Sequence, residues 1–145
     1  MGIERVTADV YRIGMGYVSA YLIAQEAVTV IDTGLPKHRE IILEAASKAG
    51  RKADEVKHIL LTHHHADHTG SLAELLAATS AKAYIHPLDA PIVRGEKPAP
   101  GPNRDVLAGR VLGPLSTFPA ASPANSTPPF CGQTNERCPA VCPGV

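Results

Sequence analysis

The alternation of hydrophobic and polar positions divides the first part of the chain into short strands and helices. β-Branched runs bounded by turn residues predict strands, and apolar residues that recur at helical spacing predict helices. The order is strand, strand, strand, helix, strand, helix, strand, which indicates a layered α/β unit. The predicted strands cover residues 10–14, 18–24, 27–34, 56–63 and 81–86, and the predicted helices cover residues 37–50 and 69–80.

Residue types define the ends of the first helix and the interior of the fourth strand. Pro36 suits the start of the helix and Gly50 its end, because proline is favoured at the first helical position and glycine just past the last. His38, near the start of this helix, is expected to face solvent. The strand "VKHILLTH" has a continuous apolar middle, which is typical of a strand buried on both faces.

The composition changes near residue 94. Residues 1–93 contain three prolines, whereas residues 94–145 contain ten. A segment rich in proline and glycine and poor in aliphatic residues rarely packs a core. We therefore expect residues 1–93 to fold and residues 94–145 to form an irregular tail of low order. The tail's Pro, Ser, Thr, Ala and Cys bias is typical of an out-of-frame reading of a GC-rich gene, so we favour a frameshift near residues 113–118 over a genuine disordered tail.

Charge and cysteine content exclude several classes of protein. The chain has 14 basic and 14 acidic residues, so no basic excess indicates a nucleic acid or an anionic membrane as partner. We find no secretory signal and no apolar run of about 18 residues, and we expect a soluble cytoplasmic protein. The three cysteines lack zinc-knuckle spacing and are expected to be plain thiols. They are Cys131, Cys138 and Cys142.

Four of the seven histidines lie in the stretch "LTHHHADHTG", residues 61–70, together with an aspartate. The stretch follows an apolar strand and precedes an amphipathic helix, and ligand-binding loops of α/β units gather at the carboxyl ends of strands. In an extended segment, residues two apart share a face. His63 and His65 are therefore expected to point together, and His64 to point away from them.

The same stretch supplies a second pair of metal-binding side chains. The turn into the following helix lets Asp67 and His68 face the cleft of His63 and His65 from another direction. Imidazole and carboxylate groups suit zinc or iron(II), and the spacing suits two adjacent metal ions. Two such ions can share a hydroxide and polarise a carbonyl or phosphoryl oxygen. The alternative is a chance histidine-rich tract, which the ordered context disfavours.

The remaining histidines are poorer ligands. His58 opens the strand that His63 ends, about 16 Å away along an extended chain, so it cannot reach the same cleft. His86 ends a strand that could lie beside the ligand strand, and we keep it as the one further histidine able to complete a site. Asp105 and the three cysteines belong to the tail, where fixed geometry is not expected.

The stretch "THHHADHTG" resembles the H-x-H-x-D-H signature of the metallo-β-lactamase superfamily, and "VIDTG", residues 30–34, resembles its second signature. The resemblance covers residues 4 to about 93 and implies the N-terminal half of an αββα sandwich. It implies Zn²⁺ as the cofactor, with Fe²⁺ as an alternative. It also implies one pair of ligands for each of two metals, namely His63 and His65 for the first and Asp67 and His68 for the second.

Asp32, in the second signature, matches an acidic residue that supports the ligand loop in the family. An aspartate can fix an imidazole tautomer by binding the ring nitrogen that faces away from the metal. The alternative is an aspartate that only initiates the turn before Thr33 and Gly34.

The resemblance implies hydrolysis of a small-molecule thioester, lactone, β-lactam or phosphodiester by a metal-bound hydroxide, with Asp67 also orienting that hydroxide.

The second half of the family fold supplies a further His, a bridging Asp and a final His, typically from segments such as Gly-His-Thr-Pro-Gly. This chain has no Gly-His pair. We therefore expect little or no activity of the chain as written. The alternatives are an inactive fragment that binds metal weakly and an iron-dependent oxygenase. A homodimer would cover the sheet face that a half-sandwich exposes.

Overall fold

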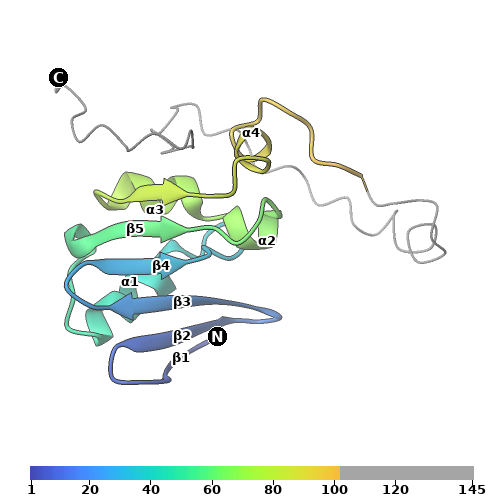
Figure 1. Ribbon diagram of the computed structural model, residues 1–145. Coiled ribbons are helices and arrows are strands. Elements are labelled where there is room, and N and C mark those ends of the chain that lie inside the picture. The colour runs from blue at the N-terminus through green and yellow to red at the C-terminus, as the bar shows by residue number, and fades with distance from the viewer. Residues whose placement is uncertain (102–145) are drawn as a thin grey trace, which may run out of the picture.

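A six-stranded mixed sheet organises the part of the chain that the computed structural model describes, residues 1–101 (Figure 1). The strands lie in chain order; β1 to β4 are antiparallel neighbours, whereas β4, β5 and β6 run parallel. The expected α/β architecture is confirmed. The strands are β1 Gly2–Arg5, β2 Val10–Met15, β3 Val18–Ala24, β4 Val28–Ile31, β5 Val56–Leu60 and β6 Lys82–Tyr84. The helices are α1 Arg39–Lys48, α2 Ala66–Thr69, α3 Leu72–Ala78 and α4 Ala90–Val93, with a 3-10 turn at Ala53–Glu55.

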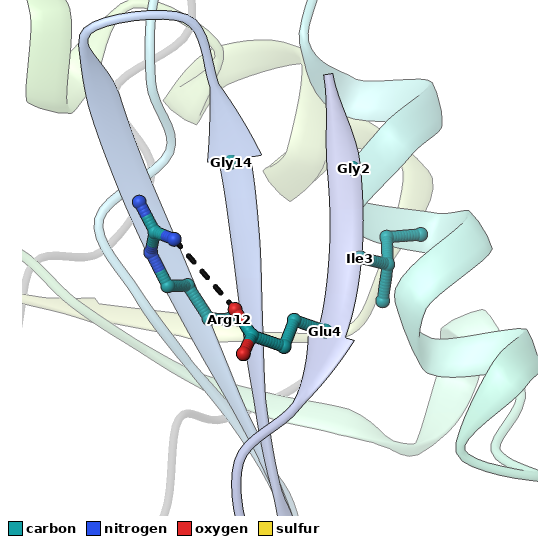
Figure 2. A pocket seen from close by; sticks show the side chains of 5 residues that line it. All are labelled: Gly2, Ile3, Glu4, Arg12 and Gly14. Atoms are coloured by element: carbon teal, nitrogen blue, oxygen red, sulfur yellow. Dashed lines mark ion pairs between the residues drawn. The ribbon is translucent and has the colours of Figure 1, made fainter.

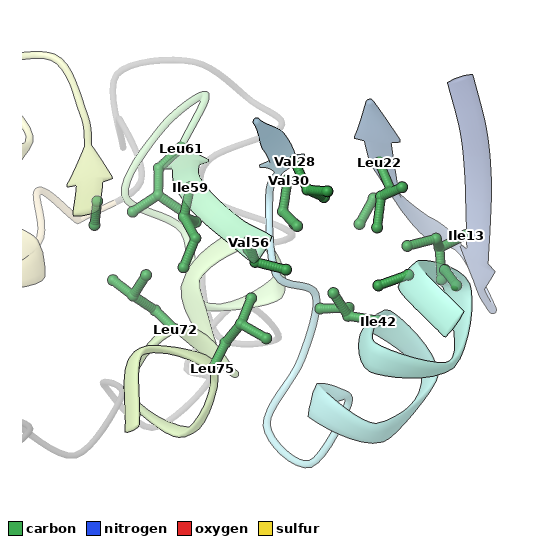
Figure 3. Packing of buried hydrophobic residues seen from close by; sticks show 14 of the residues in the cluster. Ile13, Leu22, Val28, Val30, Ile42, Val56, Ile59, Leu61, Leu72 and Leu75 are labelled. Carbon is green, nitrogen blue, oxygen red and sulfur yellow. The ribbon is translucent and has the colours of Figure 1, made fainter. Parts of the chain in front are cut away.

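The hydrophobic core lies between one face of the sheet and the helices α1 and α3. Ile42 of α1 and Leu75 of α3 are fully buried and point toward the strand side chains (Figure 3). Burying one such side chain contributes about 1.5–3 kcal/mol, so this single helix-covered face supplies much of the stability. The strand residues that meet the two helices include Ile13, Leu22, Val28, Val30, Val56 and Ile59.

The other face of the sheet has no helix of residues 1–101 packed on it. Tyr21 is 38% exposed and Leu60 is 41% exposed there. The prediction that the strand at 56–63 is buried on both faces is therefore wrong. A continuous apolar run is typical of a strand with cover on both sides, whereas residues 1–101 cover β5 on one side only. Its alternation is also interrupted, because the register with β4 shifts between Val28 and Thr29.

One predicted strand ends earlier than the sequence pattern suggested, and one predicted helix begins later. The strand predicted to reach residue 34 ends at Ile31, where Asp32 adopts a positive φ of 58° and leaves the strand. The helix predicted over 69–80 begins later, at Leu72, and is preceded by the separate short helix α2; Ser71 lies between the two, and its hydroxyl donates to Leu35 O at 2.6 Å.

The expectation that His38 faces solvent is also corrected. It is 9% exposed, not solvated, because its backbone N–H donates to the buried Ser71 hydroxyl at 2.7 Å and draws the start of α1 against α3.

Strand β1 and helix α4 were not predicted from the sequence. β1 is an edge strand with Ile3 opposite Ile13, and the other three of its residues are exposed, so its sequence shows no clear alternation. α4 has four residues and begins with Ala90 and Pro91, which is too short for a helical period to be recognised. Within residues 1–101, no helix has the length and apolarity needed to cross a bilayer.

Candidate metal centre

Two loops meet at the carboxyl ends of the parallel strands β4 and β5, and the short helix α2 lies at this end of the sheet (Figure 1). The first loop runs from residue 32 to 38 and the second from 61 to 71. Backbone hydrogen bonds join them: Thr33 N–H donates to His68 O at 2.7 Å, and Gly70 N–H donates to Gly34 O at 2.8 Å. The histidine-rich stretch is therefore held by the loop that carries Asp32.

Glycine is required where the two loops approach each other. A Cβ at Gly70 would lie 2.5 Å from both the nitrogen and Cδ of Pro36. Gly34 has a φ of +68°, and a Cβ there would collide with Met15 Sδ and lie 2.7 Å from His38 Nδ1. Side chains at either position would force the loops apart, so the close packing of the site depends on their absence.

Asp32 lies at the centre of the contact between the loops. It is 5% exposed, and its Oδ1 accepts a hydrogen bond from Thr62 N–H at 2.9 Å. Its Oδ2 accepts from Thr62 Oγ1 at 2.9 Å and from His68 Nδ1 at 2.8 Å. A carboxylate can only accept, so His68 carries its proton on Nδ1 and leaves Nε2 free to bind a metal. These are the contacts of a loop-supporting aspartate, not of one that only initiates a turn.

The four predicted ligands lie together. His63 Nε2 is 3.0 Å from His65 Nδ1, and the ring centroids of His63 and His68 are 4.1 Å apart. The second pair is also in contact, because His68 Nε2 lies 3.6 Å from Asp67 Oδ2. His63 and His65 therefore point toward each other, as expected from the sequence. Their role as metal ligands stays a prediction.

The environment of His63 favours the neutral imidazole. Burial, and after it the neighbouring rings of His68 and His65, lowers the pKa of His63 below its ordinary value of 6.5. The carboxylates of Asp32 and Asp67 oppose this effect but do not cancel it. A neutral ring is the form that binds a metal ion, so less proton competition is expected at neutral pH.

The donor chemistry of this cluster fits zinc, but the arrangement is incomplete. Within residues 1–101, no three His, Cys, Asp or Glu side chains are placed around a common point that could hold one ion. His63 and His65 instead lie at hydrogen-bonding distance from each other. The described part of the chain thus provides donors in pairs, whereas a catalytic zinc usually has three protein ligands.

The sequence model of the metallo-beta-lactamase superfamily matches residues 13–130. The chain belongs to the metallo-beta-lactamase superfamily. It is 32% identical over 93 residues to the probable metallo-hydrolase YflN of Bacillus subtilis (strain 168), covering 64% of this chain and 35% of that protein. It is 34% identical over 145 residues to a hydroxyacylglutathione hydrolase of Rhodospirillum rubrum, covering 88% of this chain and 52% of that protein.

Solved structures of metallo-beta-lactamases have the same fold. The subclass B3 enzyme MEM-A1, from a soil metagenome library, gives a TM-score of 0.64 at 29% identity, covering 70% of this chain and 39% of that one. The Rm3 metallo-beta-lactamase gives 0.62 at 30% identity, covering 70% and 38%. The chain therefore spans from about a third to about half of the length of these superfamily members.

The other histidines of this superfamily member lie apart from the cluster. His86 is exposed, and its Nδ1 accepts a hydrogen bond from Leu88 N–H at 3.3 Å. No contact within residues 1–101 joins it to the predicted ligands, so it does not complete the site there. The ring of His58 lies against that of Tyr84, with centroids 5.7 Å apart.

Sequence reasoning missed Thr62 and Asp89, which both contact the histidine-rich stretch. Thr62 could have been found, because a hydroxyl residue directly before the histidines is placed to bind Asp32. Asp89 resembles an ordinary helix cap in sequence and gave no signal. Asp105, the three cysteines and the expected frameshift lie outside the described residues, and the family match continues past residues 113–118 to residue 130.

A shallow hollow on β1 and β2 is separate from the histidine cluster (Figure 2). An ion pair crosses it, with Arg12 Nη1 3.7 Å from Glu4 Oε2. Both side chains are about half exposed or more, so the pair contributes little to stability. The sheet order separates these strands from β5, and we assign no role in the metal chemistry to this hollow.

Proposed function

We propose that the chain carries the first half of the two-metal site of a metallo-beta-lactamase superfamily hydrolase. One observation carries the proposal: the paired donors His63 with His65 and Asp67 with His68 converge at the strand ends, and the buried Asp32 fixes the ring of His68. Zinc is the proposed cofactor, with iron(II) as the alternative. A bound metal would lower the pKa of water to about 7 and polarise the substrate's reacting oxygen.

The residues of the chain have separate roles in this proposal. His63 and His65 hold one ion, while His68 and Asp67 hold the other. The side chain of Asp67 is 34% exposed, so it can also accept a hydrogen bond from an attacking water. Asp32 does not touch the metal; it keeps His68 in the tautomer that presents Nε2.

A thioester is the first substrate class to test. The chain resembles hydroxyacylglutathione hydrolases of Rhodospirillum rubrum, at 34% identity, and of Albidiferax ferrireducens, at 39% identity over 62 residues. Lactones, β-lactams and phosphodiesters follow as small-molecule alternatives within the superfamily. We also propose a cytoplasmic location, since neither charge nor sequence indicates a membrane or nucleic-acid partner.

We propose that the chain as written turns over substrate slowly. Its described residues offer two donors to each metal, and loss of a third ligand loosens both the metal and its water. The purified chain should be assayed with excess zinc against a thioester, a lactone, a chromogenic β-lactam and a phosphodiester. A zinc-dependent rate above about 1 s⁻¹ that His65→Ala abolishes would overturn this part of the proposal.

The iron-dependent oxygenase is the competing function. It uses the same first-half donors but consumes oxygen, so oxygen uptake with a persulfide and iron(II) separates it from a hydrolase.

The proposed frameshift has its own test in the genomic DNA downstream. An open reading frame encoding a Gly-His-Thr-Pro-Gly-like segment in another frame would support it, and the absence of one would overturn it.

A further inference from the structure

His64 presents its Nδ1 to helix α4, while its ring packs edge-on against that of His65, with centroids 4.8 Å apart. Its Nδ1 lies 2.6 Å from Asp89 Oδ1, at the start of that helix. The side chains are 13% and 23% exposed, so the pair is largely shielded from water and more persistent than an exposed ion pair. His64 Nε2 is buried without a hydrogen-bond partner in residues 1–101, which leaves Asp89 as the group that orients this ring.

The backbone of Asp89 is held by hydrogen bonds, but its side chain does not cap its own helix. Both of its backbone groups are hydrogen-bonded: its N–H donates to His86 O at 3.0 Å, and its carbonyl accepts from Val93 N–H at 3.0 Å. Ala90, the next residue, is 3% exposed and anchors α4 in the core. The Asp89 carboxylate makes no capping hydrogen bond, although this residue type commonly does. Its contact is with His64 instead.

The segment that carries the first pair of donors is attached at its two ends, because Thr62 N–H donates to Asp32 Oδ1 at 2.9 Å and His65 O accepts from His68 N–H at 2.9 Å. Within residues 1–101, the backbone N–H groups of His63, His64 and His65 donate no hydrogen bond. The side chains of His63 and His65 bond only inside the loop, to Thr62 and to each other. In the described part of the chain, the His64–Asp89 contact is thus the one hydrogen bond of residues 63–65 that reaches the segment after β6.

We propose that the His64–Asp89 pair is a latch that positions His63 and His65 as metal ligands. The ring of His64 meets the ring of His65 edge-on, with centroids 4.8 Å apart, and His65 Nδ1 lies 3.0 Å from His63 Nε2. When Asp89 holds His64 against α4, the His64 ring therefore limits where the ring of His65 can lie, and through His65 the ring of His63. Asp89 is a positioning residue that acts through His64. The inference rests on the proposed function for the ligand role of His63 and His65, but the orientation of their rings can be measured without a metal.

Ring spectra of the metal-free chain test the latch directly. Long-range ¹H–¹⁵N spectra of the wild-type chain should give one set of ring signals each for His63 and His65. Asp89→Ala should shift or broaden these signals, whereas Asp89→Asn, which keeps an acceptor for His64, should largely restore them. Val93→Ala is the matched control, since it loosens α4 and keeps the carboxylate. Unchanged ring signals in Asp89→Ala, or equal changes in Val93→Ala, would overturn the latch.

Zinc titration adds a functional readout. Asp89→Ala should weaken zinc binding by about 10-fold or more, in the range seen when groups that orient a ligand are removed. His64→Ala should cause a similar loss, and the double variant should lose little more, because both changes break one contact. Additive losses would overturn the latch. If the wild-type chain binds no zinc, the proposed function fails, and the ring spectra still decide the latch.

Discussion

Asp32 and His68 lie 36 positions apart in the chain, yet His68 Nδ1 donates a hydrogen bond of 2.8 Å to Asp32 Oδ2. This contact joins the two signatures of the superfamily within one structural unit. It also fixes which nitrogen of the ring can meet a metal. Asp32 performs this task from a positive φ of 58°, a conformation that aspartate and asparagine tolerate better than most residues.

Asp32→Asn should weaken zinc binding by about 10- to 100-fold with little loss of fold. Asparagine tolerates the same backbone conformation and can still accept from Thr62 N–H. Its amide group would then face His68, and the proton would move to Nε2, the nitrogen needed for the metal. Competition with a chromophoric chelator measures the affinity, and ¹⁵N ring shifts report the tautomer.

Asp32→Ala is the comparison for this variant. It removes every contact to Thr62 and His68, so it should lower both zinc affinity and the midpoint of urea unfolding. If Asp32→Asn binds zinc as tightly as the wild type, the tautomer argument is wrong.

Gly70→Ala should destabilise the chain by about 1–3 kcal/mol or more, the usual cost of overpacking. Gly70 has an ordinary φ of −61°, so backbone strain is not the reason. The cause is steric, since the new Cβ would meet backbone as well as side-chain atoms of Pro36 at 2.5 Å. Gly2→Ala is the control, because nothing lies within 4 Å of its Cβ position. Equal urea midpoints for the two variants would contradict the close packing of the loops.

The pH dependence of stability should reflect His63. Its pKa is lowered in the folded chain, so folding favours the neutral ring. The corresponding stability is present above the ordinary value of 6.5 and is lost as pH falls through the lowered pKa of the folded state. Urea unfolding of the metal-free chain should therefore become easier as pH falls below that value. His63→Gln, whose side chain does not titrate, should reduce the slope of the unfolding free energy against pH. An unchanged slope would mean that other groups cause the pH dependence.

The sequence predicted most strands and helices of the α/β unit and the position of the donors after a strand. Ile13, Leu22 and Val30 follow strand alternation, and the order of residues 63–68 placed the donors after a strand. These are local patterns that a sequence displays directly. Asp89 and Ser71 were missed for the opposite reason, because their partners lie 25 and 36 positions away and no local pattern encodes such contacts. The strand pattern missed the open face of β5, because an apolar run does not reveal whether a second layer covers it; the resemblance to half of an αββα sandwich implied an exposed face.

A homodimer through the open sheet face is the last prediction. Cross-strand pairing places Tyr21 beside Ile31, Ile31 beside Leu60 and Leu60 beside Tyr84, which forms an apolar row across β3 to β6. In the αββα family fold a second half lies over this kind of face, and none of residues 1–101 does so here. Self-association buries the row and removes apolar surface from water at about 25 cal/mol per Å².

Sedimentation velocity of the purified chain should show an oligomer that dissociates on dilution. Leu60→Lys places a charge in the middle of the row and should yield a monomer at the same concentration. Leu88→Lys is the matched control, because Leu88 is 78% exposed but lies outside the sheet, and it should leave association unchanged. A wild-type chain that is monomeric at all concentrations would contradict the homodimer. Equal effects of the two lysines would show that association uses another surface.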